Sequence, residues 1–256
     1  MKYTPKFFHD AIPSWKRKKD STCCRYIHRP ISFVFTSIAA NLGVSANTVS
    51  YISAIVALAS CASFLGGNLY TNIIAVILYN LWVILDCVDG NLARTIRKQP
   101  FGEFADAISS YILVGFSGAA IGYAAYVEGG LLFESGNAWI IIIGAIGSSA
   151  DTMMRLIFQK YKATELKMVK LGVMEPIEDV HDDSTNYSNW KIRIESEFGL
   201  GFIAIMLIPA MIFHALDVIV LYYILYYGGA CVVSSLTYIR RAIKVQVECA
   251  DKMPQE

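Results

Sequence analysis

Six long apolar segments, separated by polar ones, dominate the hydropathy pattern of this chain. They cover residues 48–66, 71–88, 104–126, 138–158, 199–215 and 218–238. Each is close to the ~20 residues that a helix needs to cross about 30 Å of hydrocarbon at a rise of about 1.5 Å per residue. Because a helix satisfies its own backbone hydrogen bonds in lipid, the pattern predicts an all-α, polytopic membrane protein with six transmembrane helices.

A different pattern precedes the first span. Between Arg25 and Leu42, apolar side chains recur at helical spacing, and polar ones fall on the other side. This predicts an amphipathic helix at the membrane surface, with a helix packed under the bundle as the alternative. The expected organisation is an N-terminal segment (1–24), an interfacial helix (25–45), a transmembrane domain (46–241) and a C-terminal tail (242–256). The long polar connection 160–198 is a lid, a substrate-shaping hairpin or a flexible loop.

Composition and charge agree with a membrane location. The chain is 55% hydrophobic and only 17% charged, against about 25% charged in typical soluble domains. The net charge of +1 gives no support to nucleic-acid binding. All 22 Lys and Arg residues lie near or beyond alternate ends of the spans, on one side of the membrane. The opposite loops hold no Lys or Arg, and their ionisable residues are Glu128, Glu134, His214 and Asp217. The positive-inside rule therefore places both termini in the cytoplasm.

The small residues and the cysteines have patterns that indicate structural roles. Gly118 and Gly122, and Gly144 and Ser148, are spaced for close helix–helix contact, either inside one bundle or in a dimer. The six cysteines form no C-x-x-C pair, and we interpret them as structural thiols.

Ionisable residues gather where the second span ends. On a helix with about 100° per residue, Asp86, Asp89, Gly90, Ala93 and Arg94 share an arc of about 140°. Carboxylates at membrane depth are costly and usually face a cavity or one another. Two acids, two small residues and a permanent positive charge on one stripe indicate a functional site.

The third span begins with a second polar stripe. Gly102, Asp106 and Ser110 are four residues apart, and Glu103 lies close to the same face. The connection between the second and third spans is short, so we expect the stripes to face each other and bring the three aspartates together. Carboxylates at such short distances do not all stay ionised unless a cation lies between them. Hard oxygen ligands on rigid helices suit Mg²⁺ or Mn²⁺, with substrate phosphates completing the coordination shell.

The run Asp86-x-x-Asp89-Gly90-x-x-Ala93-Arg94-(x7)-Gly102-x-x-x-Asp106 resembles the signature of the CDP-alcohol phosphatidyltransferases. The resemblance covers roughly residues 25–241 and implies a membrane enzyme of phospholipid or related polar-lipid synthesis, active as a homodimer among membrane lipids. Such enzymes bind a CDP-alcohol donor at the cytoplasmic mouth of the bundle. An acceptor alcohol attacks the β-phosphorus, and CMP leaves.

The resemblance also implies residue roles. Asp86, Asp89 and Asp106 would bind the divalent metal ions. Gly90, Ala93 and Arg94 would line the CDP pocket, and Gly102 would let the third helix approach the second closely. These roles follow from the match to the family's signature.

One position departs from the signature. The family's final Asp, proposed as a metal ligand and as the base for the acceptor hydroxyl, is Ser110 here. A serine hydroxyl is too weakly basic to replace it unaided. Three explanations remain open: a natural substitution with Glu103 or metal-bound water as the base, an engineered substitution that traps a substrate complex, or a catalytically dead homologue that still binds CDP-alcohol. The x7 spacing, where eight is common, is a smaller departure.

Two further interpretations stay open. Asp151 and Arg155 are four residues apart, so they form a helix ion pair, or Arg155 faces the cavity and binds an acceptor phosphate or the pyrophosphate. A cation-coupled transporter could also use buried carboxylates, but it would not require the Gly90-x-x-Ala93-Arg94 run. The acceptor alcohol, and whether the donor carries a lipid, cannot be read from the sequence.

Overall fold

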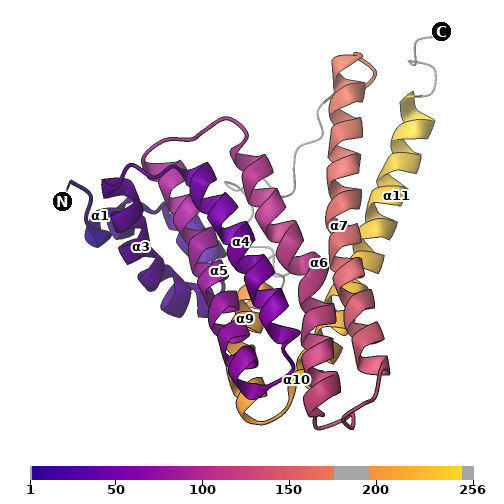
Figure 1. The fold of residues 1–256 in the computed structure, drawn as a ribbon. Coiled ribbons are helices and arrows are strands. Elements are labelled where there is room, and N and C mark those ends of the chain that lie inside the picture. Colours follow the sequence, from indigo (N-terminus) through magenta and orange to yellow (C-terminus); the bar gives the residue numbers. More distant parts are fainter. Residues whose placement is uncertain (1, 176–196, 250–256) are drawn as a thin grey trace.

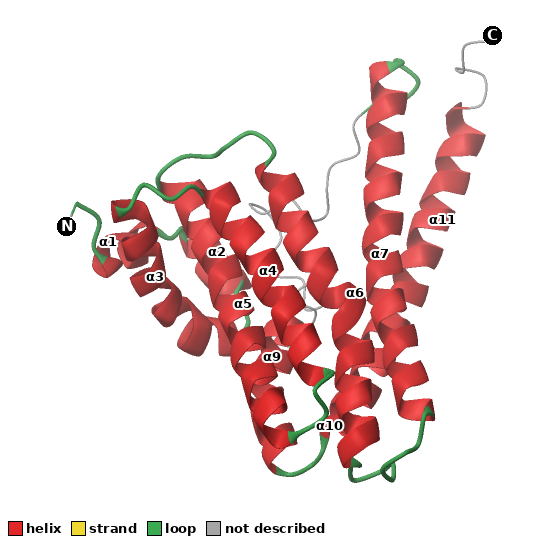
Figure 2. Cartoon of the chain, in the orientation of Figure 1, coloured by secondary structure: helices red, strands yellow, loops and turns green. Residues whose placement is uncertain are grey.

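A computed structural model describes residues 2–175 and 197–249 of the chain. Within this part, every residue belongs to a helix or a loop, as Figure 2 shows, which confirms the predicted all-α fold. The segment 176–196, which is most of the predicted connection 160–198, lies outside the described residues, and so does 250–256 at the end of the predicted tail.

The N-terminal part is a set of short helices beside the bundle. α1 (Pro5–Ala11) and α2 (Ser14–Lys19) lead through a π-helical turn, η1 (Cys24–His28), into α3 (Arg29–Asn41). The apolar face predicted for this region is exposed on α3, whereas Arg29, Ser32 and Thr36 are buried. α3 therefore turns its polar face to the protein and its apolar face outward, as a helix lying in a lipid interface does.

In the described part of the chain, five helices are long and apolar enough to cross a membrane. They are α4 (Ala46–Phe64), α5 (Leu69–Thr95), α6 (Gly102–Glu128), α7 (Trp139–Lys170) and the continuous stretch Leu216–Cys249, which comprises α10 (Leu216–Tyr223), η2 (Ile224–Gly228) and α11 (Gly229–Cys249). The fifth predicted span is a shorter apolar helix, α9 (Leu200–Ile212), of 13 residues with Pro209 inside it. At about 1.5 Å per residue it does not reach across about 30 Å of hydrocarbon.

Two helices continue beyond the predicted boundaries. The hydropathy pattern predicts a fourth span that ends at 158 and a connection from residue 160, whereas α7 continues to Lys170. Hydropathy finds only the apolar part of a helix, whereas the polar part holds a Lys162–Glu165 pair at 2.7 Å and no helix breaker before Gly172. Likewise, α11 continues to Cys249, beyond the predicted start of the tail at 242.

Local sequence explains where the helices that carry the site begin. The Ser45 side chain accepts a hydrogen bond from the Thr48 amide at the start of α4. Asn68 and Thr71 form a reciprocal capping box at the start of α5. Each cap satisfies backbone groups that the first helical turn leaves unpaired, which fixes the start of the helix.

α6 and α7 touch backbone to backbone. A Cβ atom on Gly144 would lie 2.1 Å from the Gly118 carbonyl oxygen, and one on Gly118 would lie 2.4 Å from the Gly144 oxygen. Ser148 also accepts a hydrogen bond from the Gly118 amide, at 2.8 Å. The small residues therefore serve close packing inside the bundle.

The order of packing differs from the order along the chain. α6 packs mainly against α4 and α7, and α5 packs mainly against α4, α3 and α9. The apolar core formed by these helices contains Tyr79, Trp82, Leu113 and Leu207. In Figure 1 the α5–α6 connection and the ends of α7 and α11 lie at the upper end of the molecule. The carboxylate-rich ends of α5 and α6 thus lie at that end, beyond the core.

Candidate active site

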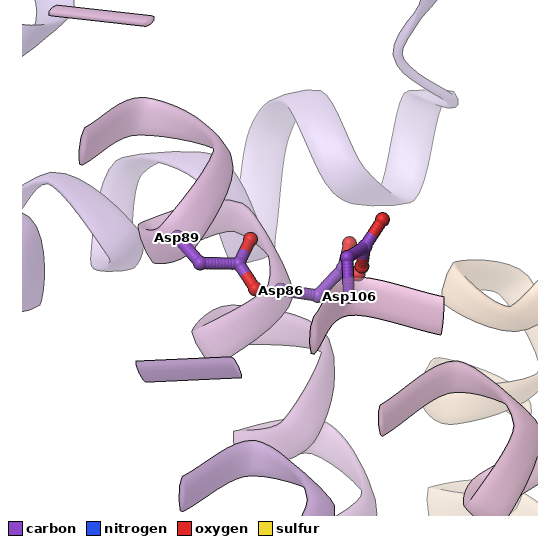
Figure 3. A group of neighbouring side chains, drawn as sticks. All are labelled: Asp86, Asp89 and Asp106. Atoms are coloured by element: carbon purple, nitrogen blue, oxygen red, sulfur yellow. The ribbon is translucent and has the colours of Figure 1, made fainter. Parts of the chain in front are cut away.

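Three aspartates from two helices meet near the upper end of the bundle. Each of Asp86, Asp89 and Asp106 offers a carboxylate oxygen within 4.8 Å of the other two, as drawn in Figure 3. Asp89 is buried, Asp86 is half-buried and Asp106 is exposed. The group therefore has a buried side and an open side from which a ligand can approach.

The donor set of this cluster fits a divalent cation. Three carboxylate oxygens this close repel one another strongly unless a positive charge lies between them. Carboxylates are the ligands of hard cations such as Mg²⁺ and Mn²⁺, and Mg²⁺ commonly takes only part of its octahedral shell from protein. The open side leaves room for the remaining ligands to come from a substrate.

Asp89 is fixed by a neighbouring helix. The Ser50 hydroxyl on α4 donates a hydrogen bond of 2.6 Å to Oδ2 of Asp89. Ser50 is not among the site residues that the sequence predicts. Its position one turn after the N-terminus of α4, among the small polar residues Ser45, Thr48 and Ser53, was the available signal.

The predicted small residues have different surroundings. A Cβ on Gly90 would lie 2.8 Å from Nη2 and 3.0 Å from Nη1 of Arg94, so the guanidinium lies over Gly90. Ala93 is half-buried beside the cluster of Val88 and Leu92. At Gly102 a Cβ would meet only Oδ1 of Asn47, at 3.5 Å. Gly102 thus lies beside α4, and the close approach to α5 that we expected there does not occur.

The two candidate bases are placed differently. Ser110 is half-buried on α6, one turn after Asp106. Its neighbour Ser109 is buried and belongs to the packing, with Ser53 Oγ at 2.6 Å and a hydrogen bond of 2.8 Å from Trp82 Nε1. Glu103 has a 94% exposed side chain and lies 3.7 Å from Lys98. It lines a cavity of about 690 Å³ between α6 and α7, and it lies outside the aspartate cluster.

Arg155 forms the predicted helix ion pair and also lines a cavity. Its Nε donates to Asp151 Oδ1 at 2.8 Å, and Asp151 Oδ2 accepts a 3.0 Å hydrogen bond from Tyr223. Arg155 also lines a cavity of about 270 Å³ beside Tyr226, Tyr227 and the first residues of α9. Asp151 therefore anchors Arg155 at the wall of this cavity.

The N-terminal segment also reaches the signature helix, which sequence analysis missed. Arg29 binds Asp20 through two hydrogen bonds, of 2.9 Å from Nε and 2.7 Å from Nη2. Its Nη1 donates to Oδ1 of Asn91, at 2.9 Å. Cys24 of the same segment has its sulfur 3.6 Å from that of Cys87. The polar face of the amphipathic helix and the polar residue between Gly90 and Ala93 were the signals that could have indicated these contacts.

Comparison with known proteins agrees with the geometry. A search of curated proteins found no match. The sequence model of one family, described as CDP-alcohol phosphatidyltransferase, matches residues 43–229. That range covers more than half of the chain and includes all three aspartates, Gly90, Arg94 and Arg155. This chain is therefore a member of the CDP-alcohol phosphatidyltransferase family.

Proposed function

We propose that this protein transfers a substituted phosphate group from a CDP-linked alcohol to an acceptor alcohol and releases CMP, in phospholipid or related polar-lipid synthesis. The observation that carries the proposal is the meeting of Asp86, Asp89 and Asp106 with their oxygens within 4.8 Å. They lie inside a domain of a family whose members perform this class of reaction.

The proposed mechanism begins with the donor. Asp86, Asp89 and Asp106 would hold Mg²⁺ or Mn²⁺, whose charge offsets that of the donor's pyrophosphate when the ion is bound. Arg94 lies over Gly90 on the same helix, so its permanent charge supports the same phosphates. Because Gly90 has no side chain, this part of the helix surface has room for the Arg94 guanidinium and for the donor's phosphates.

The acceptor would enter on the Arg155 side. Asp151 fixes Nε of Arg155, so the rest of the guanidinium faces the cavity beside Tyr226 and Tyr227. This arrangement favours an acceptor that carries an anionic or strongly polar group. The acceptor hydroxyl attacks the β-phosphorus and releases its proton to water at the open side of the site. The bond from that phosphorus to the bridging oxygen breaks, and CMP leaves with the bonding electron pair.

Ser110 bears on the removal of the hydroxyl proton. Phosphoryl transfer has a loose transition state in most analyses, and its catalysis consists mainly of positioning and charge stabilisation. A weak base at position 110 is therefore compatible with a slow reaction. The exposed Glu103, 3.7 Å from Lys98, is poorly placed to act instead. The second candidate, a CDP-alcohol binder without turnover, rests on this same serine.

The orientation and assembly are part of the proposal. The one-sided distribution of Lys and Arg supports a cytoplasmic location for both termini and for the site. The family resemblance supports a homodimer.

The test is CMP release from a panel of CDP-alcohols and acceptor alcohols. We expect release that depends on Mg²⁺ or Mn²⁺, stops with chelator and is lost in Asp89→Asn. Ser110→Asp is the informative second variant: CMP release that appears only in it favours the binder. Binding of CDP-alcohol that is equal with and without divalent metal would contradict the metal site.

A further inference from the structure

Two arginines converge on one buried side-chain amide. Asn91 is fully buried, and its Oδ1 accepts hydrogen bonds from Arg29 Nη1 at 2.9 Å and from Arg94 Nη2 at 3.4 Å. Its Nδ2 donates to the hydroxyls of Ser32 and Thr36, both at 3.2 Å. Guanidinium groups only donate, so the oxygen of Asn91 must face them, and the orientation of the amide is determined by its partners.

The two arginines carry their charge differently. Arg29 is 6% exposed, and Asp20, which is 7% exposed, neutralises it through the paired hydrogen bonds. Arg94 is exposed, and in the described part of the chain it has no carboxylate within ion-pair distance. Its guanidinium lies over Gly90, on the helical face that carries Asp86 and Asp89. The charge of Arg94 is therefore the one left for a ligand.

We propose that Asn91 is a positioning residue for the CDP-alcohol: its amide oxygen holds the Arg94 guanidinium over Gly90, and the buried Asp20–Arg29 pair holds Asn91 in place. This inference rests on the proposed function, because it takes the donor's pyrophosphate as the ligand of Arg94. It adds that the N-terminal segment, which precedes the family-matched residues 43–229, supports donor binding through this contact.

The physical reason is the flexibility of arginine. An exposed Arg side chain samples many rotamers, and binding a phosphate must restrict them at a cost of about 0.5–1.5 kcal/mol in a typical interface, or up to about tenfold in Kd. A buried acceptor that already holds one Nη group reduces this loss. Arg29 is not available to the ligand, because it is buried and Asp20 offsets its charge.

The test measures binding of CDP, the part shared by all CDP-alcohols, to the full chain in detergent with saturating Mn²⁺. The variants are Asn91→Leu, which has a similar volume and accepts no hydrogen bond, and Asn91→Asp, which keeps the oxygen. Ser32→Ala is the matched control, because it removes a partner of the Asn91 nitrogen and leaves Thr36 to hold it. Affinity for Mn²⁺ without CDP and the thermal midpoint are measured for each.

We expect Asn91→Leu to raise the Kd for CDP about tenfold, with Mn²⁺ affinity unchanged. By the same arithmetic, the Kd for CDP of Asn91→Asp and of Ser32→Ala should be within about threefold of the wild-type value. In an Arg94→Ala background, Asn91→Leu should add no further loss, because Asn91 acts through Arg94. This coupling keeps the test decisive even if Asn91→Leu lowers the thermal midpoint.

Three results would overturn the inference. Equal CDP binding by Asn91→Leu and the wild type contradicts it alone and leaves the proposed function standing. Equal losses from Asn91→Leu in the wild-type and Arg94→Ala backgrounds would show a general packing role for Asn91. A wild-type chain that binds no CDP with Mn²⁺ contradicts the proposed function, and the inference falls with it.

Discussion

Ser50 on α4 and Asp89 on α5 are joined by a hydrogen bond of 2.6 Å, and both side chains are buried. The bond holds Oδ2 of Asp89, whose carboxylate also belongs to the aspartate cluster. Partners of this kind orient metal ligands, and their loss typically costs 10–100-fold in metal affinity.

Ser50→Ala should therefore weaken Mn²⁺ binding by about tenfold. In this variant the buried carboxylate of Asp89 has lost its hydrogen-bond donor, so its orientation toward Asp86 is less defined. Titration calorimetry with Mn²⁺ measures the change. Ser60→Ala is the control, because Ser60 is also buried on α4 but donates to the Ala75 carbonyl. Equal affinities of the two variants would show that Ser50 does not support the site.

Asp20→Ala should destabilise the fold. Removing one partner of a buried ion pair leaves an uncompensated charge and typically costs about 3–5 kcal/mol. Arg29 would be that charge, since Asp20 supplies both of its carboxylate contacts. Asp10→Ala is the matched control, because the Asp10 side chain is 59% exposed beside His9. A thermal midpoint of Asp20→Ala equal to that of the control would refute the importance of the pair.

Cys24 and Cys87 should form a disulfide on mild oxidation. Their sulfurs lie 3.6 Å apart, and the hydrogen bond shared with Cys87 lowers the pKa of Cys24 despite burial. A lower pKa raises the fraction of thiolate, the form that attacks. Treatment with diamide, a two-electron oxidant, followed by non-reducing digestion and mass spectrometry should yield a linked peptide pair. Cys61→Ser should retain the product and Cys24→Ser should lose it. Its absence from the wild type would contradict this packing of η1 on α5.

Stability should fall in mild acid because of His28. Burial lowers the pKa of His28, and its hydrogen bond with Asn80 at 3.1 Å opposes this only in part. The unfolded state therefore takes up a proton near the ordinary value of about 6.5, whereas the folded state does not until lower pH. Above about pH 6.5 the imidazole is neutral in both states, and His28 has no effect on the pH dependence. As the pH falls below about 6.5, the unfolded state is protonated first, so the free energy of unfolding decreases.

The thermal midpoint measured from pH 7.5 to 5.5 checks this. His28→Gln keeps a polar side chain that does not titrate in this range, so the thermal midpoint should decrease less steeply with falling pH. His9→Gln is the control at an exposed position. A decrease that is as steep in His28→Gln as in the wild type would assign it to other groups.

Helical periodicity and residue spacing were sufficient to predict that the three aspartates lie close together. Asp86, Asp89 and Asp106 lie on stripes that helical geometry defines within each helix, so their convergence could be predicted. The reason for it could not: we expected α5 and α6 to pack together, but α4 lies against both, and Ser50 of α4 contacts Asp89. Contacts that depend on a third element leave no periodic trace in the sequence.

The remaining differences have similar causes. Asp20 and Asn91 are far apart in sequence and are linked only through Arg29, so no local pattern relates them. The polar end of α7 escaped detection because hydropathy measures affinity for lipid and does not report helix formation. The short α9, by contrast, is apolar enough to look like a full span, although it has 13 residues.

The orientation of α3 has a consequence for where the chemistry takes place. Its apolar side is exposed, and its polar side is hydrogen-bonded through Asn91 to the helix that carries Asp86 and Asp89. A helix of this kind rests at the boundary between acyl chains and headgroups. It would thus hold the aspartates at a constant depth in the bilayer, where a lipid-anchored substrate and a water-soluble one can reach the same phosphorus without either leaving its own phase.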